Sequence, residues 1–222
     1  GAVKAFFSCW QEGTRLDFQG KYYKHTLMTP MFNPGPLEWG PPPVMLGAMG
    51  PGMTRVAGEV ADGLIVHPFN TLPFLENLQM PALQEGLEKS GRQRGDFINQ
   101  IAGICVTGAT EEEYQAAKTT VCGLLAFYGS TPAYLPPMEA VGYEALQPEL
   151  NRLSKEGRWE EMTALIDDDF LNAFAVCGEP DTIAAGLADK YGGLADRLSI
   201  YAPYTLADET WAGIISQLKE SS

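Results

Sequence analysis

Short apolar runs alternate with longer amphipathic segments through most of this sequence, from residue 44 to its C-terminal end. Four of the apolar runs have the length of a buried strand, and they cover residues 44–47, 64–66, 101–106 and 197–202. Apolar residues with helical spacing predict helices at 53–61, 72–90, 111–128, 181–191 and 206–218. Strands that alternate with helices in this way predict an α/β fold whose parallel sheet is joined by crossover helices.

The first 43 residues do not follow this alternation. Helical spacing there links five apolar residues: Ala2, Val3, Phe6, Phe7 and Trp10. No initiator methionine precedes them, so we expect the chain to start inside a helix of a longer protein. A short hairpin or an irregular lid is predicted around Gln19 and Gly20. The stretch 30–43 is rich in proline and glycine, which disfavour both a helix and a central strand, and it therefore predicts a loop.

A second interruption lies between the third predicted helix and the last unit of the alternation. Residues 129–174 carry their own helical pieces around 144–155 and 159–168, so they predict a helical insertion rather than a linker. Four strands with such an insertion amount to about half of an eight-stranded β/α barrel, which needs roughly 250 residues without insertions. An open parallel sheet of this kind has unpaired edges that invite partner chains.

The amino-acid composition and net charge indicate which kinds of partner the protein is expected to bind. An apolar share of 45% in 222 residues indicates a packed globule, and 28 acidic against 15 basic side chains give a net charge of −13. This charge repels phosphate backbones and anionic lipid surfaces, so we expect neither nucleic acid nor a membrane as a partner. No apolar run approaches the roughly 20 residues of a membrane span, and the start does not resemble a signal peptide, which predicts a cytoplasmic protein.

Cysteine and acidic residues do not indicate a metal site. The four cysteines are far apart in the sequence and form no C-x-x-C pair: Cys9, Cys105, Cys122 and Cys177. Only His25 and His67 could join them as soft ligands, so we expect reduced, buried thiols and no metal. The acidic runs at 160–161 and 167–169 could form a cation site or a carboxylate pair, but their places beside predicted helices favour solvated helix ends.

The most informative segment is PPPVMLGAMGPGMTRVAGEVADGLIVHPF, residues 41–69, in which a strand, a glycine-rich turn, a helix and a second strand follow one another. The turn at 47–52 comes directly after the carboxyl end of the strand. Its glycines let the backbone approach a ligand, and the free N–H groups and dipole of the next helix favour an anion such as phosphate. The same turn also suits plain strand-to-helix geometry, and it matches neither the Walker loop nor the dinucleotide fingerprint.

Several co-linear motifs make the chain resemble the luciferase-like monooxygenase family. They are W-x-x-G at 10–13, D-F-x-G-x-Y-Y at 17–23, the PPP-strand-G-A-x-G-P turn at 41–51, A-G-E-V-A-D-G at 57–63 and G-E-P-D-T-I-A at 178–184. The stretches at 127–134, 149–162 and 196–204 are similar to a subgroup of oxidoreductases that depend on the deazaflavin coenzyme F-420. The resemblance covers essentially the whole chain.

This resemblance implies a TIM (β/α)8 barrel of the bacterial-luciferase-like type, of which the chain would hold about the second half. The four predicted strands would be strands five to eight, with the helical insertion before the last strand. We then expect one partial barrel domain over 1–222. Its parts would be a helix and lid-like segment (1–43), β/α units (44–128), the insertion (129–174) and the last β/α unit (175–222).

In the resembled family the loop after strand five holds the phosphate of a flavin or deazaflavin through backbone amides. On matching positions this implies the following cofactor-binding residues: Gly47, Ala48, Met49, Gly50, Pro51, Met53 and Thr54. Met49, Gly50 and Met53 would offer N–H groups, and Thr54 a hydroxyl. The implied cofactor is coenzyme F-420, with FMN as the alternative.

Active sites of β/α barrels gather at the carboxyl ends of the strands. This rule nominates seven residues that follow predicted strands: His67, Phe69, Thr107, Gly108, Ala202, Pro203 and Tyr204. His67 could touch the cofactor ring or the substrate, or it could be a structural residue at a strand end. Tyr128 and Tyr134 are expected either to line the substrate cleft or to pack within the insertion. The predicted substrate pocket is thus His67, Phe69, Tyr128, Tyr134 and Tyr204, and no catalytic residue is assigned.

The resemblance as a whole implies an oxidoreductase that transfers a hydride between coenzyme F-420 and a small organic substrate. In such an enzyme the protein supplies binding, orientation and exclusion of water. An FMN-dependent monooxygenase that uses reduced flavin and oxygen is the alternative among enzymes. An alternative of another class is a non-catalytic fragment or assembly module, whose exposed sheet edges pair with another chain, for instance in a homodimer.

Overall fold

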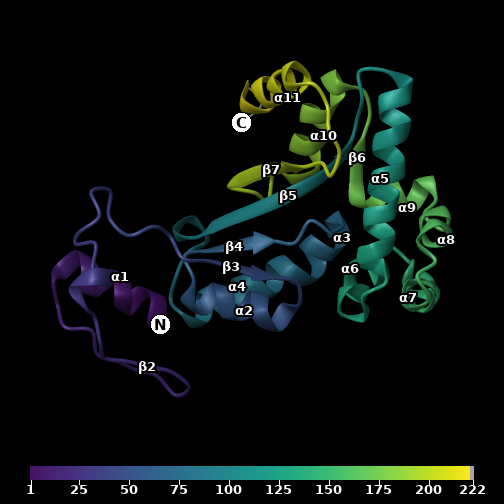
Figure 1. Cartoon of the computed structure of the whole chain (residues 1–222). Coiled ribbons are helices and arrows are strands. Elements are labelled where there is room, and N and C mark those ends of the chain that lie inside the picture. Colours follow the sequence, from purple (N-terminus) through teal and green to yellow (C-terminus); the bar gives the residue numbers. More distant parts are fainter. Residues whose placement is uncertain (221–222) are drawn as a thin grey trace.

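The computed structural model describes residues 1–220, and its centre is a five-stranded parallel sheet (Figure 1). The strands are β3 (Met45–Ala48), β4 (Gly63–Val66), β5 (Ile98–Val106), β6 (Ala175–Cys177) and β7 (Arg197–Tyr201). The longest strand, β5, pairs with β4, β6 and β7, while β3 pairs with β4. The predicted α/β fold with a parallel sheet is confirmed.

The sequence predicted four strands, and this number is wrong because the prediction missed β6. That strand has only three residues and starts directly after helix α9 (Asp168–Phe174), so it is too short to show the pattern of a strand in the sequence. It pairs with Ile104, Cys105 and Val106 at the carboxyl end of β5, whereas β7 pairs with the stretch that ends at Ile104. The insertion is therefore followed by two strands rather than one.

The crossover helices lie close to their predicted positions. They are α2 (Pro51–Val60), α4 (Met80–Lys89), α5 (Glu111–Gly129), α10 (Pro180–Tyr191) and α11 (Asp208–Glu220). The helix predicted over 72–90 is divided into α3 (Leu72–Phe74), a π-helical turn (Leu75–Gln79) and α4, and a 3₁₀ turn (Arg94–Asp96) follows. Pro81 has no N–H to donate to the carbonyl four residues earlier, which accounts for the irregular turn before it.

Alternate rows of residues across the sheet are buried and exposed. Ala48, Val66 and Ile101 are partners in register and all are buried, in the core that the sheet shares with α2, α4 and α10. The adjoining row contains Gly47 and Ile65, which are both exposed, and Ile65 retains 41% of its surface. Because successive side chains point to opposite faces of a strand, one face of the sheet is covered and the other is open.

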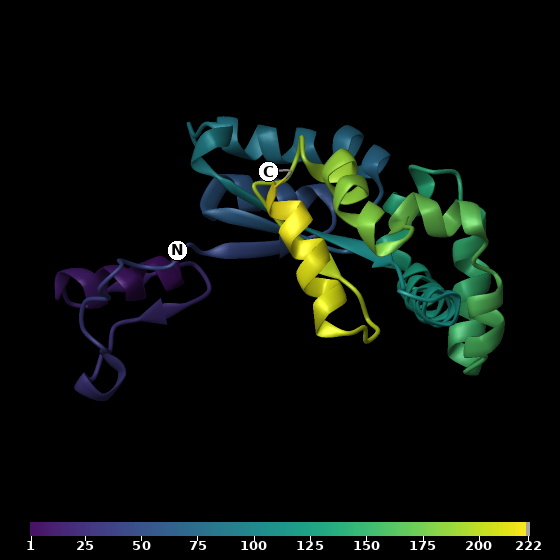
Figure 2. The ribbon, with the colours of Figure 1, turned by 90° about the horizontal axis from the view of Figure 1, so that it is seen from above.

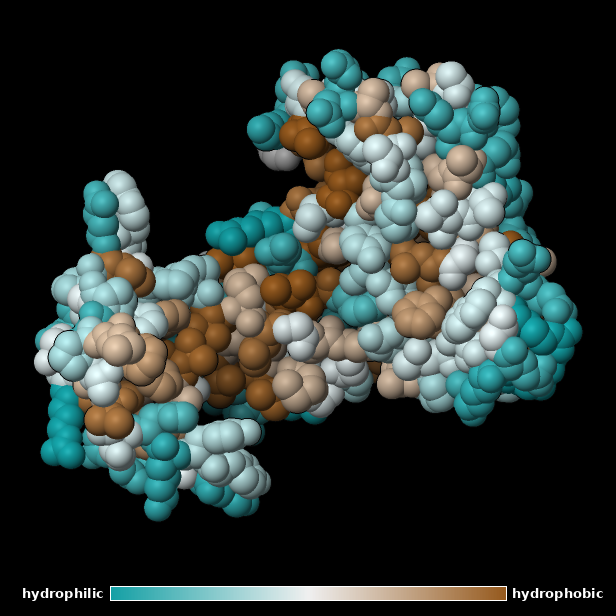
Figure 3. Space-filling view, in the orientation of Figure 1, coloured by the Kyte–Doolittle hydropathy of each residue, from teal (hydrophilic) through white to brown (hydrophobic). Residues whose placement is uncertain are grey.

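The open face and two free edges show that the barrel is not closed. Among the described residues β3 pairs only with β4, and β7 pairs only with β5. All-parallel sheets are normally covered on both faces. In the space-filling view, apolar residues gather over the part of the molecule that contains β3 and β4 (Figure 3). This arrangement agrees with the predicted part of a TIM barrel.

Helix α2 lies close to α4 because glycines meet at their contact. A Cβ added to Gly58 would lie 2.7 Å from the carbonyl oxygen of Leu83, and Gly86 is restricted in the same way. Arg92 donates hydrogen bonds to the carbonyls of Gly58 and Ala61 near the C-terminal end of α2. This packing fixes α2, and with it the glycine-rich turn that precedes the helix.

Residues 1–43 stand apart from the sheet in both ribbon views (Figure 1, Figure 2). They comprise α1 (Ala2–Glu12), a hairpin of β1 (Phe18–Gln19) and β2 (Lys24–His25), and a 3₁₀ turn (Pro30–Phe32). The predicted helix and hairpin are confirmed. Lys4 forms an ion pair of 2.5 Å with Asp62, whose second carboxylate oxygen accepts a hydrogen bond of 2.8 Å from the N–H of Val44. This contact ties α1 to the sheet.

The insertion forms a helical layer against α5. Its helices are α6 (Leu135–Glu139), α7 (Gln147–Glu156), α8 (Trp159–Ala164) and α9, with 3₁₀ turns at Pro132–Tyr134 and Glu144–Leu146. The sequence analysis did not predict α6, whose two prolines lie in the first turn, where proline is tolerated. Leu125, Leu150, Met162 and Phe170 belong to one core that joins these helices to β5 and β6.

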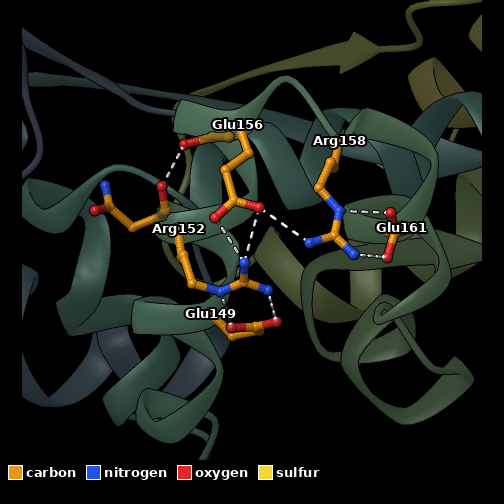
Figure 4. A network of polar contacts seen from close by, with 7 residues as sticks. Glu149, Arg152, Glu156, Arg158 and Glu161 are labelled. Atoms are coloured by element: carbon orange, nitrogen blue, oxygen red, sulfur yellow. Dashed lines mark hydrogen bonds and ion pairs between the residues drawn. The ribbon is translucent and has the colours of Figure 1, made fainter.

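Charged side chains join α7 to α8 on the outer surface of the insertion (Figure 4). Arg152 contacts Glu149 and Glu156, and Arg158 contacts Glu156 and Glu161. Glu156 thus lies between the two guanidinium groups, at 2.7 and 3.0 Å. Since all five side chains are exposed, these pairs add little to stability and chiefly orient the two helices.

Candidate functional site

The glycine-rich turn connects the carboxyl end of β3 to the N-terminus of α2. Gly50 is the N-cap of α2 in an extended conformation (φ −86°, ψ 159°), and Pro51 opens the first helical turn. The first hydrogen bond of the helix runs from the N–H of Thr54 to the carbonyl of Gly50. Within residues 1–220 the N–H groups of Gly52 and Met53 have no partner, so they are available to an anion.

The fold itself does not require three glycines of this turn. Gly47, Gly50 and Gly52 are not among the glycines with positive φ. A Cβ added to any of the three would meet no atom within 4 Å. Neither backbone strain nor internal packing therefore explains these glycines, in contrast with Gly58 in the same helix. Open space beside a bare backbone is what close approach by a ligand requires.

The residues predicted to bind the cofactor differ in burial. Five of them are exposed or half-buried: Gly47, Met49, Gly50, Pro51 and Met53. Ala48 and Thr54 are buried. The hydroxyl of Thr54 donates to the carbonyl of Gly50 at 3.0 Å, so it is engaged inside the protein and does not offer the hydrogen bond that the sequence suggested. The backbone amides of the turn are the groups left for an anion.

A residue that the sequence did not single out contacts the turn from the buried side. Gln79, at the end of the π-helical turn, is 1% exposed, and its side-chain N–H donates to the carbonyl of Ala48 at 3.0 Å. The same amide nitrogen lies 3.4 Å from the hydroxyl of Thr54. In the sequence Gln79 is one polar residue within a helical segment, and its spacing does not indicate that it turns inward.

A second group of predicted residues meets beyond the carboxyl end of β4. The ring of His67 lies between two tyrosines, with centroid distances of 4.9 Å to Tyr128 and 4.7 Å to Tyr134. Phe69 is buried, lies 5.8 and 6.1 Å from the same tyrosines, and stacks on Phe174 at 4.3 Å. Four of the five residues predicted for the substrate pocket therefore lie together, although they come from distant parts of the sequence.

Hydrogen bonding and burial define the state of His67. Its Nδ1 accepts a hydrogen bond of 3.1 Å from the N–H of Phe69, so in the neutral ring the proton is on Nε2. Burial lowers the pKa of His67 below its ordinary value, which keeps the ring neutral near pH 7. No residue in the described part of the chain bonds to Nε2, which leaves that N–H as a donor beside the tyrosine rings.

Tyr204, the fifth residue predicted for the pocket, is turned into the protein. Its hydroxyl donates to the carbonyl of Cys105 at 3.0 Å and accepts from the N–H of Thr107 at 3.1 Å. Burial raises the pKa of Tyr204 and keeps its hydroxyl protonated. Tyr201, which the sequence did not single out, instead reaches the aromatic group, since its hydroxyl lies 3.2 Å from that of Tyr128.

Thr107 and Gly108, also nominated from the sequence, do not join this group. Thr107 is fully buried, and a Cβ added to Gly108 would lie 2.4 Å from the backbone nitrogen of Tyr114, so Gly108 serves the packing of the loop against α5. Gly108 also lines a cavity of about 360 Å³ near the N-termini of α5 and α10. Glu111 and Glu179 line the same cavity, and their carboxylates disfavour an anion there.

The remaining candidates, Ala202, Pro203 and His25, do not contribute polar groups to either group of residues described above. Ala202 and Pro203 follow β7 and offer no polar side chain. His25 stacks on Phe18 and Tyr23 within the hairpin, in the segment that stands apart from the sheet. Residues 1–220 bring together no three His, Cys, Asp or Glu side chains that could hold a metal ion, and the four cysteines are free. No helix in the described part of the chain is both long and apolar enough to span a bilayer.

The parallel sheet with its crossover helices has one open face, and a glycine-rich turn follows the carboxyl end of β3. These features define part of a β/α barrel. The sequence model of the luciferase-like monooxygenase family matches residues 2–197, and the chain belongs to this family.

Relatives of known sequence agree with this assignment. An uncharacterized protein of Mycobacterium tuberculosis is 46% identical over 197 residues, which are 89% of this chain and 58% of that protein. The 5,10-methylenetetrahydromethanopterin reductase of Methanopyrus kandleri is 28% identical over 82% of this chain and 50% of its own length. The F420-dependent glucose-6-phosphate dehydrogenase of Nakamurella multipartita is 31% identical over 76% of this chain and 46% of its own length. The chain thus spans about half the length of the curated relatives it matches.

Solved structures confirm the fold. The coenzyme F420-dependent tetrahydromethanopterin reductase of Methanopyrus kandleri superposes with a TM-score of 0.72 at 21% identity, over 97% of this chain and 60% of that one. An F420-dependent secondary alcohol dehydrogenase superposes with a TM-score of 0.62 at 15% identity, over 97% of this chain and 57% of that one. The predicted barrel of the luciferase-like type, present in part, is therefore confirmed.

Proposed function

We propose that the turn at 47–53 binds the phosphate of coenzyme F-420, and that the protein transfers a hydride between this coenzyme and a small organic substrate. The observation that carries the proposal is the row of Gly47, Gly50 and Gly52. These glycines have open space where side chains would be, and they lie beside unbonded N–H groups at the N-terminus of α2. A phosphate fits such a place because it needs N–H donors and a positive helix end.

Charge also favours α2 over other helices of the sheet as the anion site. The first turn of α2 contains no acidic residue. In contrast, α5 begins with Glu111, Glu112 and Glu113, and α10 has Asp181 in its first turn. Carboxylates at those N-termini already occupy the positive end of the helix dipole and repel a further anion.

The relatives support F-420 as the cofactor. The glucose-6-phosphate dehydrogenase of Nakamurella multipartita is named as F420-dependent, as are two of the solved structures of the same fold. FMN is the alternative, because a riboflavin lyase of the same fold, with a TM-score of 0.54 at 14% identity, is named as a complex with modified FMN. The hydride chemistry would come from the bound coenzyme, while the protein binds and orients it.

The aromatic group beyond β4 suits the substrate side of the site. His67, Phe69, Tyr128 and Tyr134 provide apolar ring surface and no charged side chain. The Nε2–H of His67 would donate a hydrogen bond to a substrate oxygen. These features favour a small, uncharged organic substrate. We also propose a cytoplasmic location, which the four free thiols suit.

Equilibrium titration tests the choice of cofactor. The purified chain is titrated with oxidised F-420 and separately with FMN, and binding is followed by the fluorescence of the cofactor. We expect saturable binding of F-420 and weaker binding of FMN. Binding of FMN alone would contradict the F-420 proposal and favour the monooxygenase.

A second candidate function is assembly with a second copy of the chain through the open sheet. The observation in its favour is a cleft of about 690 Å³ at the free edge of β7, lined by Leu198 and Ile200 of that strand and by Ile215 of α11. An unpaired edge of this kind is a template for pairing with another strand. Ile215, which lines this cleft and is exposed, would be covered in such a homodimer.

The mass of the chain in solution tests this second candidate. Light scattering after size exclusion should give twice the mass of one chain. Ile215→Glu in the cleft should return the monomer, whereas Val60→Glu should not, because Val60 is similarly exposed but lies on α2, away from the cleft. A native chain that is monomeric would exclude assembly of this kind.

A further inference from the structure

Gln79 contacts both the glycine-rich turn and the helix α2 that follows it, from the buried side. Its Nε2 donates to the carbonyl of Ala48 at 3.0 Å and to the hydroxyl of Thr54 at 3.4 Å. That hydroxyl donates in turn to the carbonyl of Gly50 at 3.0 Å. We infer that Gln79 is the positioning residue of the phosphate-binding turn, an inference that rests on the function proposed above.

The neighbours of Gln79 fix the orientation of its side-chain amide. The side-chain atom of Gln79 that faces Ala48 and Thr54 must be the nitrogen. If the amide were turned round, its Oε1 would face the carbonyl oxygen of Ala48, which cannot donate a hydrogen bond and would repel it. Oε1 is buried and has no partner within residues 1–220. An unpaired buried acceptor is costly, so the two donated bonds are the interactions that offset the cost of placing an amide here.

The bond to Ala48 determines the direction of the next N–H group. No peptide bond within the described residues is cis, and in a planar trans peptide the C=O and N–H groups point in opposite directions. With its carbonyl turned toward Gln79, Ala48 is followed by a Met49 N–H that points away from the buried side. The bond through Thr54 holds the carbonyl of Gly50, and the unbonded N–H groups of Gly52 and Met53 come directly after it.

Gln79 has a rigid base for this role. It ends the π-helical turn that leads into α4, and α4 packs against α2 through the contact of Gly58 with Leu83 and Gly86. The two helices that carry Gln79 and Thr54 are therefore fixed relative to each other. Pre-arranged donors bind an anion more tightly than donors that must first be ordered.

The variant Gln79→Met removes the two donated bonds and keeps most of the side-chain volume. It also removes the unpaired Oε1, so the fold should be retained. Gln84→Met is the matched control, because Gln84 lies on the exposed side of α4 and bonds only to Glu88 among the described residues. Gln79→Leu is a second variant of different shape, and circular dichroism checks that all three are folded.

Each protein is titrated with F-420 and with the same deazaflavin from which the phosphoryl side chain has been removed. We expect Gln79→Met to weaken F-420 binding about five- to tenfold, the range of one hydrogen bond, and to leave binding of the phosphate-free compound unchanged. Gln84→Met should change neither affinity. A native chain that binds both compounds equally would contradict the proposed phosphate site. The role of Gln79 would be overturned if Gln79→Met and Gln79→Leu bound F-420 in preference to the phosphate-free compound as strongly as the native chain does.

Amide hydrogen exchange gives a readout that does not require the coenzyme. Loss of the two bonds should loosen the turn, so exchange of the Met49 and Gly50 amides should become several-fold faster in Gln79→Met. Exchange of the Ile101 amide in the sheet should not change. If the turn exchanges at the native rate in both Gln79 variants, the inference is wrong even where no coenzyme binds.

Discussion

The hydroxyl groups of Tyr128 and Tyr201 lie 3.2 Å apart and join the end of α5 to the strand β7, across 73 residues of sequence. The ring of Tyr128 also contacts His67, Phe69 and Tyr134. The end of α5, directly before the insertion, is therefore anchored to the sheet at the place where the proposed substrate pocket lies. The geometry of that pocket depends on this pair.

Removing either hydroxyl should weaken the anchor. Tyr128→Phe and Tyr201→Phe should each lower the free energy of unfolding by about 0.5–1.5 kcal/mol, and the double variant should cost little more than either single one. Urea unfolding followed by circular dichroism measures all four proteins. Losses that simply add in the double variant would mean that the two hydroxyl groups do not stabilise each other.

Two glycines of α2 should respond to alanine in opposite ways. Gly52→Ala should raise the free energy of unfolding by up to about 1 kcal/mol, because nothing crowds a Cβ there and alanine favours helix. Gly58→Ala should lower it by about 1–3 kcal/mol, because the Cβ would lie 2.7 Å from the carbonyl of Leu83. Thermal and urea unfolding distinguish the two. Destabilisation by Gly52→Ala would show that the fold, rather than a ligand, requires that glycine.

The depressed pKa of His67 should make stability depend on pH. Below its ordinary pKa of about 6.5 the unfolded chain binds a proton at this ring that the folded chain, with its lower pKa, does not bind. The contribution of His67 is therefore complete above about pH 6.5 and is lost as the pH falls from there through the folded pKa. In His67→Gln the fall in melting temperature between about pH 7.5 and 5.5 should be smaller. An unchanged fall would contradict the burial of a neutral His67.

The sequence was sufficient for the regular parts of the fold. Apolar runs and amphipathic spacing located β3, β4, β5 and β7 and the crossover helices to within a few residues, because long periodic segments dominate local preference. The short strand β6 was out of reach, since its three residues are defined by their pairing with the end of β5. The helix α6 was not predicted, since it has only five residues and two of them are prolines.

The part of the candidate site that could be predicted is the glycine-rich turn, whose proposed ligand contacts come from backbone N–H groups. Glycines before a helix indicate an anion-binding turn from spacing alone. The inward turn of Thr54, in contrast, follows from its hydrogen bonds with Gly50 and Gln79. Gln79 and Tyr201 could not be selected, because their roles come from contacts with residues far away in the sequence. Tyr204 was selected by its place after a strand, but its hydroxyl bonds to β5 and the loop after it.

Binding of F-420 to the native chain and to Gly50→Asp tests the central claim most directly. Aspartate is a favourable N-cap, so the variant should fold at least as well as the native chain while it places a negative charge in the proposed phosphate site. The account predicts saturable binding to the native chain and at least about a tenfold loss in Gly50→Asp. Equal binding by both proteins, or no binding by the native chain, would contradict it.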